Sequence, residues 1–394
     1  MGKKIAVVGL YTLPNMGDLL LCETTAYLIK QLSPDATIVK VDACPYYRES
    51  YKGIDYVKYR ISRKMLTWSK KFAYENGGRW RHSYESEMWK LRVGSHYKRR
   101  LNGVDAIVFA GGGFIKYRTQ GLNYYVEQII NYATSHNIPV MMNAMGIEGY
   151  DDNDYRCKRL QQAINSDVVK VITTRDDIDL LRDKYITNPN IVTARVGDPA
   201  LWSPECYGIE RNQDSDTVGI NIIRANIFKD YGNNLSAQGL NAFYKDLIRE
   251  LEARQIKWTM FTNGMKSDVK MGVKVLEELG MNPDEKLLSA PNTPLDLLNT
   301  VKGYSSVFGA RLHACITSYA VDVPVVGFIW NEKTRFFSQI IDKSENFFEE
   351  DDISPSKIVD RLMTARNEKY DKSIRNNLKE LTKKYIEIFI RENI

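Results

Sequence analysis

The chain has 394 residues, a length that predicts two compact domains and excludes a single small module. Its composition, 43% hydrophobic and 26% charged, is close to the globular average, which argues against disordered, collagen-like and disulfide-scaffold proteins. The five cysteines are widely spread and form no CxxC pair, as expected for reduced thiols in a cytosolic protein without a zinc site. No stretch approaches the roughly 20 apolar residues of a membrane span, so we expect a soluble, cytoplasmic protein.

Short apolar runs alternate with glycine-rich turns and helical patterns, which is the signature of parallel α/β sheets. The predicted strands cover residues 5–10, 37–41, 106–110, 140–144, 169–173, 191–196, 218–223, 258–262, 306–308 and 323–329. The predicted helices between them include residues 19–32, 124–135, 237–254, 268–279 and 312–321. We therefore predict two Rossmann-like, doubly wound domains that face a cleft, over residues 1–208 and 209–350.

The carboxy terminus departs from this alternation. Ile374, Leu378, Leu381, Tyr385 and Phe389 recur at helical spacing with Lys, Arg and Glu between them, which predicts an amphipathic helix. We expect the helices of residues 351–394 to pack back across the two domains. A helix that lies on a membrane surface is the alternative.

Charge is concentrated in one segment. Residues 58–100 carry thirteen Lys and Arg against three Glu, a net charge of +10, whereas the whole chain has only +6. Basic groups interleaved with aromatic rings are able to hold a polyanion, an anionic lipid surface or a sugar. We leave open a peripheral membrane contact and a plain solvated helical insertion, and we expect no nucleic acid because no reader motif accompanies the charge. The aromatic residues of the segment are Tyr59, Trp68, Phe72, Tyr74, Trp80, Tyr84, Trp89 and Tyr97.

A turn with Asn15, Gly17 and Asp18 follows the first strand and precedes the first predicted helix. The free backbone N–H groups of a helix amino terminus suit an anion or a sugar hydroxyl, so we predict that this turn lines the cleft. Asp18 is also explained as the N-cap of that helix.

Two further turns follow strands of the first domain. Gly111, Gly112 and Gly113 come after residue 110, where glycine permits positive φ and close approach of the backbone to a ligand. A tight packing turn is the alternative. Arg175 follows the strand at 169–173, and its planar guanidinium suits a carboxylate or a phosphate unless Asp176 neutralises it.

The strongest candidate lies in the second domain. His313 falls in the first turn of a helix that follows the strand at 306–308, with Arg311 two residues before it. Lys333 follows the next strand, so Lys333 and His313 are expected at the same edge of a parallel sheet. We predict that His313 is catalytic rather than structural.

These pieces, in this order, resemble the polysaccharide pyruvyl transferase family. The resemblance runs from about residue 5 to about residue 340. The matching segments are NMGD at 15–18, DAIVFAGGG at 105–113, NAMGI at 143–147, TRD at 174–176, VGDPA at 196–200, ARLHA at 310–314, DVPVVG at 322–327 and Lys333.

The resemblance implies an architecture similar to B-type glycosyltransferases. It implies transfer of an enolpyruvyl unit from phosphoenolpyruvate to two hydroxyls of a sugar, which forms a pyruvate ketal. It places Arg175, His313 and Lys333 at the phosphoenolpyruvate site. It also implies bacterial capsule or exopolysaccharide biosynthesis at the cytoplasmic face of the membrane, on a saccharide acceptor that can be lipid-linked.

The residue types fit this chemistry independently of the resemblance. Phosphoenolpyruvate carries a carboxylate and a phosphate, so its site needs several cations, and Arg175, Lys333 and Arg311 are the candidates. Protonation of the methylene carbon needs a group that titrates near neutrality, which is His313. No metal or cofactor is required. Two alternatives stay open: a nucleotide-sugar glycosyltransferase of the same architecture, and a non-catalytic glycan or anionic-lipid binding protein that uses residues 58–100.

Overall fold

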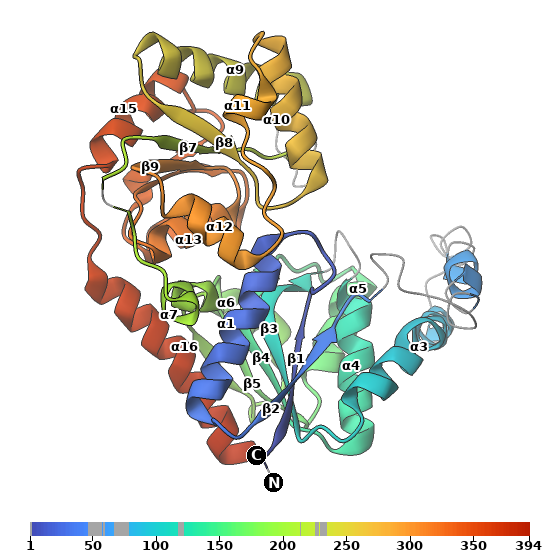
Figure 1. Cartoon of the computed structure of the whole chain (residues 1–394). Coiled ribbons are helices and arrows are strands. Elements are labelled where there is room, and N and C mark those ends of the chain that lie inside the picture. Colours follow the sequence, from blue (N-terminus) through green and yellow to red (C-terminus); the bar gives the residue numbers. More distant parts are fainter. Residues whose placement is uncertain are drawn as a thin grey trace. The chain divides into compact units, whose positions relative to one another are not determined.

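The computed structural model describes residues 2–45, 57, 60–66, 79–116, 122–212, 214–224, 228 and 235–394. These residues form two compact units, each built on its own parallel sheet (Figure 1). Unit 1 consists of Met1–Leu13, Thr25–Val196 and Leu381–Ile394, and unit 2 consists of Pro14–Thr24 and Gly197–Glu380. The chain therefore crosses from one unit to the other four times.

Unit 1 contains a sheet of six parallel strands in the order β2-β1-β3-β4-β5-β6. Ile5, Ala6, Val7 and Val8 of β1 are completely buried, as expected for a strand that is covered on both faces of a parallel sheet. The strand order reverses between β1 and β3. The strands are β1 (Lys4–Gly9), β2 (Thr37–Asp42), β3 (Ala106–Lys116), β4 (Val140–Glu148), β5 (Val169–Thr174) and β6 (Val192–Arg195).

Helices cover this sheet with their apolar sides. In α4, Tyr125, Ile129 and Ala133 recur four residues apart and are buried in the main core of unit 1, with Val8 and Ile107 of the sheet. The elements that lie wholly in unit 1 are α3 (Arg79–Leu101), α4 (Leu122–His136), α5 (Tyr155–Ile164), α6 (Ile178–Leu180) and a π-helical turn η1 (Leu181–Tyr185). Helix α1 (Met16–Leu32) belongs to unit 2 up to Thr24 and to unit 1 beyond it.

Unit 2 contains a sheet of five parallel strands in the order β11-β10-β9-β7-β8, which reverses between β7 and β9. Its strands are buried on both faces. Phe308 of β9 and Phe328 of β10 pack with Leu247 and Leu362 on one face, whereas Val307 of β9 belongs to the cluster of the other face. The strands are β7 (Val218–Asn221), β8 (Trp258–Phe261), β9 (Ser306–Gly309), β10 (Val325–Ile329) and β11 (Phe347–Glu349).

The helices of unit 2 fall on the two faces of this sheet. Helices α9 and α15 contribute to the first cluster, and α12, α13 and α14 contribute to the second. The elements are the 3-10 helix η2 (Pro199–Trp202), α7 (Ser203–Tyr207), α9 (Ala237–Ala253), α10 (Lys266–Glu278), α11 (Pro283–Lys286), α12 (Pro294–Val301), α13 (Leu312–Ala320), α14 (Glu332–Ile340), the 3-10 helix η3 (Ser344–Asn346) and α15 (Pro355–Ala365). The prediction of two Rossmann-like α/β domains is confirmed, and the cleft between them stays a prediction.

The limits of the two units differ from the predicted limits of 1–208 and 209–350, with 351–394 apart. The division falls between Val196 and Gly197. Helix α15 belongs to unit 2, because Ile358 and Leu362 are completely buried in its core. Helix α16 (Lys372–Asn393) is divided, with its residues up to Glu380 in unit 2 and the rest in unit 1.

The apolar side of α16 packs inside the protein. Leu378 packs in unit 2, whereas Leu381 and Tyr385 contact Ala194 and Val196 in unit 1. None of the described helices is both long enough and apolar enough to cross a bilayer.

Candidate functional site

The carboxyl ends of the strands of unit 2 carry a group of polar side chains at the point where the strand order reverses. Asn221 is the last residue of β7, and Arg311 follows β9, the neighbouring strand. The side-chain oxygen of Asn221 accepts a hydrogen bond from the backbone N–H of Arg311 at 3.0 Å. Ligands of open parallel sheets bind at such a reversal, so the candidate site of unit 2 is built here.

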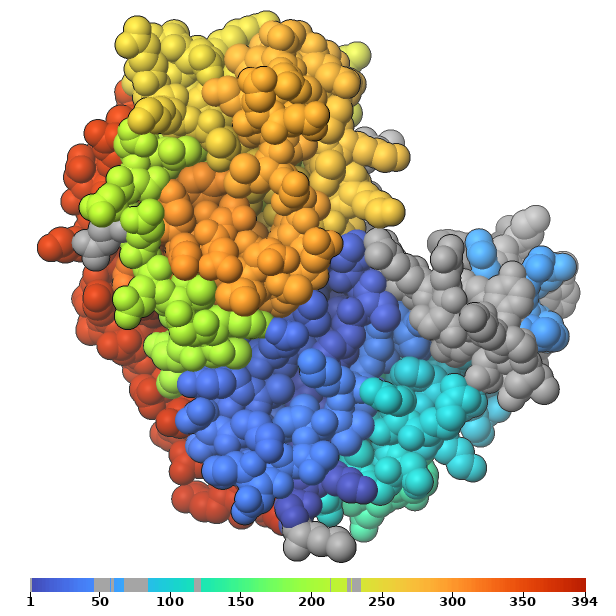
Figure 2. All heavy atoms as spheres, in the orientation of Figure 1, coloured from blue at the N-terminus to red at the C-terminus, as the bar shows by residue number. Residues whose placement is uncertain are grey.

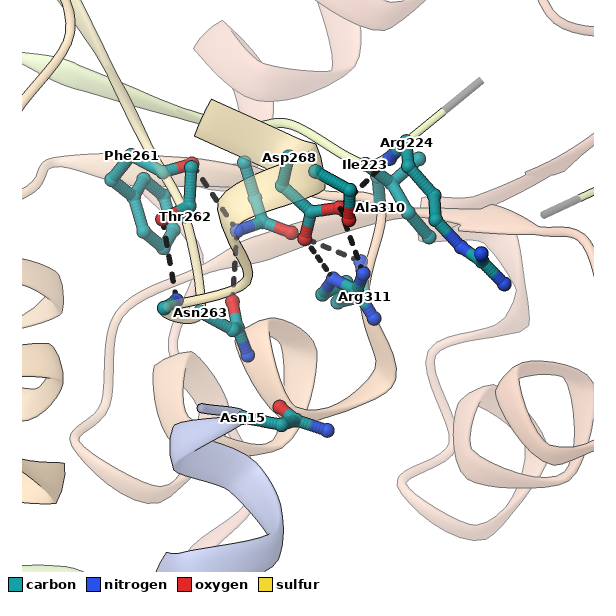
Figure 3. Close-up of polar contacts among 12 residues, drawn as sticks. Asn15, Ile223, Arg224, Phe261, Thr262, Asn263, Asp268, Ala310 and Arg311 are labelled. Atoms are coloured by element: carbon teal, nitrogen blue, oxygen red, sulfur yellow. Dashed lines mark hydrogen bonds and ion pairs between the residues drawn. The ribbon is translucent and has the colours of Figure 1, made fainter. Parts of the chain in front are cut away.

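Asn263, which follows β8, extends this group toward the loop before α1. Its side-chain oxygen accepts a hydrogen bond from the amide of Asn221 at 2.9 Å, and its backbone carbonyl accepts from the N–H of Met16 at 2.9 Å. Figure 3 shows the amide of Asn263 on the side of Asn15. Asn263 is completely buried, yet its Nδ2 has no hydrogen-bond partner among the described residues. A buried N–H group without a partner is costly, so this nitrogen is a donor ready for a ligand or a water.

A buried tyrosine holds the backbone of Asn221 in place. The Tyr244 hydroxyl donates a hydrogen bond to the backbone carbonyl of Asn221 at 3.3 Å. Burial raises the pKa of the Tyr244 phenol, so it stays neutral and acts as a donor here.

Arg311 has a structural partner that the sequence did not reveal. Its Nε and Nη2 atoms donate to the carboxylate of Asp268, the latter at 2.9 Å, and Asp268 is completely buried in the first turn of α10 (Figure 3). The backbone N–H of Arg224 donates to the same carboxylate at 2.9 Å. The predicted contact of Arg311 with phosphoenolpyruvate stays a prediction, and it would be made by a guanidinium whose charge Asp268 already balances.

His313 is the second residue of α13 and is held from two sides. Its Nε2 lies 3.8 Å from Oδ2 of Asp198, and both side chains are almost completely buried. Asp198 is the N-cap of η2 and accepts a hydrogen bond from the N–H of Ala200 at 2.8 Å, which fixes its orientation. A Cβ atom added to Gly17 would lie 2.4 Å from the imidazole ring, so only glycine permits this approach. A buried carboxylate at this distance favours the charged imidazolium.

The helix that follows the turn at 15–18 begins earlier than the sequence predicts. Helix α1 begins at Met16 rather than near Leu19, so Asp18 lies in its first turn and is not the N-cap. The side-chain amide of Asn15 donates to the carboxylate of Asp18 at 2.8 Å. Asn15, Gly17 and Asp18 belong to unit 2, and Gly17 lies against the ring of His313, which comes from the other end of the chain.

Lys333 lies at the same edge of the sheet of unit 2. It is the second residue of α14, which follows β10, and its side chain is half-buried. The side chain of Asn331 caps α14 by accepting from the N–H of Thr334 at 2.9 Å. The structure thus brings Arg311, His313 and Lys333 to neighbouring strand ends of one sheet.

Arg175 belongs to unit 1, where it follows β5 and is almost completely buried. Its Nε lies 4.0 Å from Oδ1 of Asp176, so the neutralisation that was left open is present in part. Asp176 also accepts a hydrogen bond from the backbone N–H of Ile147 at 3.0 Å. The predicted meeting of Arg175 with His313 and Lys333 stays a prediction.

The three glycines of unit 1 do not form a turn after β3. The strand continues through them to Lys116, and the pairing of β3 with β4 shifts register between Gly112 and Ile115. Gly111 and Gly112 have φ of 81° and 87°, a backbone that other residues rarely adopt. They therefore form a bulge in the strand, which differs from the predicted glycine loop.

The basic and aromatic segment is described in part. Tyr59, Trp68, Phe72 and Tyr74 lie outside the described residues. Trp89 and Tyr97 of α3 are buried in the core of unit 1, where Trp89 stacks on Tyr124 with ring centroids 5.1 Å apart. These two rings are therefore core residues and not a platform for sugar.

One known protein family matches most of the chain. The family model of polysaccharide pyruvyl transferases matches residues 15–332, which include every residue of the candidate site of unit 2 apart from Lys333. The chain belongs to the polysaccharide pyruvyl transferase family. No curated protein is significantly similar to it in sequence.

Solved structures resemble this member of the family in fold. The UDP-GlcNAc 2-epimerase of Methanocaldococcus jannaschii has a TM-score of 0.57 at 12% identity, over 99% of this chain and 100% of that one. A putative UDP-N-acetylglucosamine 2-epimerase of Listeria monocytogenes has a TM-score of 0.56 at 11% identity, over 99% and 96%. The UDP-GlcNAc 2-epimerase of Neisseria meningitidis has a TM-score of 0.51 at 10% identity, over 99% and 100%. These enzymes share the two-sheet architecture of B-type glycosyltransferases, and at this identity they show the fold alone.

The sequence pointed to His313 and Lys333 but missed Asn221, Asn263 and Asp268. Each of the three stands alone in its own segment, at or just after a strand or in the first turn of a helix. A polar residue at the end of an otherwise apolar strand, as in Asn221, was the signal that could have drawn attention to them. Among the described residues no group of His, Cys, Asp and Glu is arranged to hold a metal ion.

Proposed function

We propose that the chain is a ketal-forming pyruvyl transferase that uses phosphoenolpyruvate as donor and a saccharide as acceptor. Membership of the polysaccharide pyruvyl transferase family supports the reaction class. The observation that carries the proposal within the molecule is the pair of His313 and Asp198, 3.8 Å apart at the sheet edge of unit 2. The setting in cell-surface polysaccharide assembly, with an acceptor that can be lipid-linked, is part of the same proposal.

In the proposed reaction His313 acts as the acid. The imidazolium gives its proton to the methylene carbon of phosphoenolpyruvate, and positive charge develops at the adjacent carbon. One sugar hydroxyl attacks that carbon and returns its proton to the imidazole. The bond to the phosphate oxygen then breaks, the second hydroxyl closes the ketal, and its proton leaves with inorganic phosphate. Asp198 acts through His313, because it stabilises the imidazolium that starts the cycle.

The donor carries a carboxylate and a phosphate, which need cations and N–H donors. Lys333 lies one strand away from His313 and offers an ammonium group. The amide nitrogen of Asn263 is a buried donor without a partner among the described residues. Arg175 of unit 1 is proposed as a further cation, as the family resemblance implies.

The experiment measures phosphate release from phosphoenolpyruvate in the presence of a panel of pyranose acceptors. His313→Ala should lower turnover by about 100- to 10,000-fold, which is the usual contribution of a positioned acid. His136→Ala is the matched control, because His136 is exposed at the end of α4, and it should keep the wild-type rate. A near-normal rate for His313→Ala would remove the histidine from the mechanism.

The same panel separates the proposal from its rival. Transfer of a sugar from a nucleotide sugar, with no consumption of phosphoenolpyruvate, would identify a glycosyltransferase of the same architecture. Product with two fewer exchangeable hydroxyls and one new methyl group, detected by NMR, would identify the ketal.

A further inference from the structure

The proposed function leaves unexplained one part of unit 1, which we call the arm: the helical residues 60–66 together with α3. Helix α3 extends away from the sheet of unit 1, with residues 60–66 near its amino-terminal end (Figure 1). The hydroxyl of Tyr84 on α3 donates a hydrogen bond to the backbone carbonyl of Met65 at 3.3 Å. The two helices of the arm are therefore joined directly.

The arm exposes apolar side chains to solvent. In the described part of the chain, four of the seven exposed large apolar side chains lie on the arm or at its start. They are Val57, Ile61, Met65 and Leu91, with exposed fractions of 52%, 47%, 37% and 37%. Exposed apolar groups that gather in one region mark an interaction surface more often than isolated ones do.

Helical spacing places two of these apolar side chains on the same side of a helix. Ile61 and Met65 are four residues apart within one helix, so they lie on one side of it. Ser62 and Leu66 are buried and form the neighbouring side that faces the protein. Figure 2 shows part of the segment 60–66, in light blue, at the surface of the molecule.

Both helices of the arm expose positive charge. Arg60, Arg63 and Lys64 are exposed on the same helix, and Lys90 and Lys98 are exposed on α3. Among the described residues of the arm, the exposed acidic side chain is Glu87, whose Oε1 lies 3.7 Å from Nζ of Lys90. A helix with an exposed apolar stripe and basic residues beside it is the pattern that binds the interface of an anionic bilayer.

Helix α3 of the arm is fixed to unit 1 by buried polar contacts. Glu85 of α3 is buried and accepts hydrogen bonds from the hydroxyls of Tyr124 at 2.9 Å and Tyr155 at 3.1 Å. Arg159 of α5 lies 3.7 Å from Glu85 and pairs with Glu127 of α4. This buried polar cluster joins α3 to α4 and α5, and the sequence did not reveal it.

We propose that the arm docks the protein on a bilayer that contains anionic lipids. Ile61 and Met65 insert among the acyl chains near the headgroups, and the basic residues contact lipid phosphates. A polyanion such as a nucleic acid fits the charge but leaves the exposed apolar side chains without a role. Of the aromatic residues that the structure describes on α3, Trp89 and Tyr97 are buried in the core, so these two rings offer no face to a sugar.

The test is flotation of the full-length protein with vesicles of phosphatidylcholine, with or without phosphatidylglycerol. We expect binding only when phosphatidylglycerol is present, and weaker binding at high salt because salt screens the headgroup charge. The double variant Ile61→Glu with Met65→Glu should lose at least about tenfold in partition coefficient.

The matched control is the double variant Leu288→Glu with Leu295→Glu. These leucines are exposed by 37% and 38% and belong to unit 2, so the control adds the same charge to side chains of similar exposure in the other unit. It should bind vesicles like the wild type. Circular dichroism checks that both double variants are folded.

Absence of vesicle binding, or an equal loss in both double variants, would overturn the proposal. Binding to heparin that persists in Ile61→Glu with Met65→Glu, without vesicle binding, would instead identify a polyanion surface and also overturn it. The assay contains neither phosphoenolpyruvate nor saccharide, so its result does not depend on the proposed catalytic function.

Discussion

Asp198→Asn removes one charge from the candidate site and leaves its shape in place. The side-chain oxygen of asparagine is still able to accept from the N–H of Ala200, the contact that orients Asp198 at 2.8 Å. The lost charge lies 3.8 Å from Nε2 of His313, and both side chains are at most 10% exposed. Two unit charges at this distance interact by about 4 kcal/mol at an effective dielectric constant near 20.

The sign of the effect follows from the charges. Asp198 favours the imidazolium, so without it His313 should lose its proton at a lower pH. In a profile of phosphate release against pH, the falling limb of Asp198→Asn should lie at lower pH than that of the wild type. Where both profiles are falling, the variant should be at least about tenfold slower than the wild type, because one pH unit of separation is a tenfold difference in the protonated fraction, and acidification should restore much of the rate.

A matched control is Glu205→Gln, which also removes a carboxylate from this part of unit 2. Glu205 pairs with Lys379 rather than with His313, so its pH profile should match that of the wild type. An NMR titration of the imidazole resonances gives a readout without substrate, since the chain has only four histidines and His313→Ala assigns the relevant one. An unchanged titration in Asp198→Asn would refute the reasoning even if the enzyme proved active.

Three further predictions concern packing, the buried ion pair and the thiols. Gly17→Ala should lower turnover by about 100-fold, because its Cβ would lie 2.4 Å from the ring of His313 and displace it. The control is Gly94→Ala on α3, whose Cβ meets nothing closer than 3.5 Å, so turnover should stay unchanged. Asp268→Asn should lower the free energy of unfolding by about 3–5 kcal/mol in urea titrations, because the largely buried guanidinium of Arg311 loses the charge that balances it. A loss below about 1 kcal/mol would contradict this. Burial raises the pKa of Cys206 to about 11, so at pH 8 this thiol stays protonated and should react slowly with Ellman's reagent until the protein is unfolded. Rapid modification of native Cys206, located by mass spectrometry, would show that the thiol is more accessible than the structure indicates.

The sheets were largely predictable because parallel strands are buried on both faces and appear in sequence as short apolar runs. The strand at 5–10 is observed as Lys4–Gly9, and the one at 306–308 as Ser306–Gly309. The length of β3 was not predictable, because glycines usually end a strand. Here the positive φ of Gly111 and Gly112 forms a bulge, after which Ile115 pairs with Ile147 of β4.

Strand β11 was missed because its three residues carry no periodic pattern. It is defined instead by packing: a Cβ atom on Gly327 would lie 2.1 Å from the ring of Phe347, so the glycine of β10 makes room for that ring. The start of α1 was misplaced for a similar reason. The hydrogen bond from Met16 to Asn263 joins two segments that are distant in the sequence, and no local pattern announces it.

In the candidate site, too, contacts between distant segments were not predictable from the sequence. Placing His313 required only the rule that parallel sheets keep their chemistry at the carboxyl ends of strands. Pairing it with Asp198, or Arg311 with Asp268, required the three-dimensional contacts, because one sequence offers many carboxylates and does not say which one each cation meets.

Because the chain passes between the two units four times, one cut in the chain does not separate them. A single nick near residue 209 gives two fragments, yet the first carries Pro14–Thr24 of unit 2 and the second carries Leu381–Ile394 of unit 1. Each fragment thus keeps a piece of the other's fold, so nicked protein should co-purify as one particle until it is denatured. For the same reason, a hybrid that joins the first part of this chain to the last part of a relative at one junction would combine segments of both proteins within each unit. A functional hybrid has to exchange all segments of one unit together.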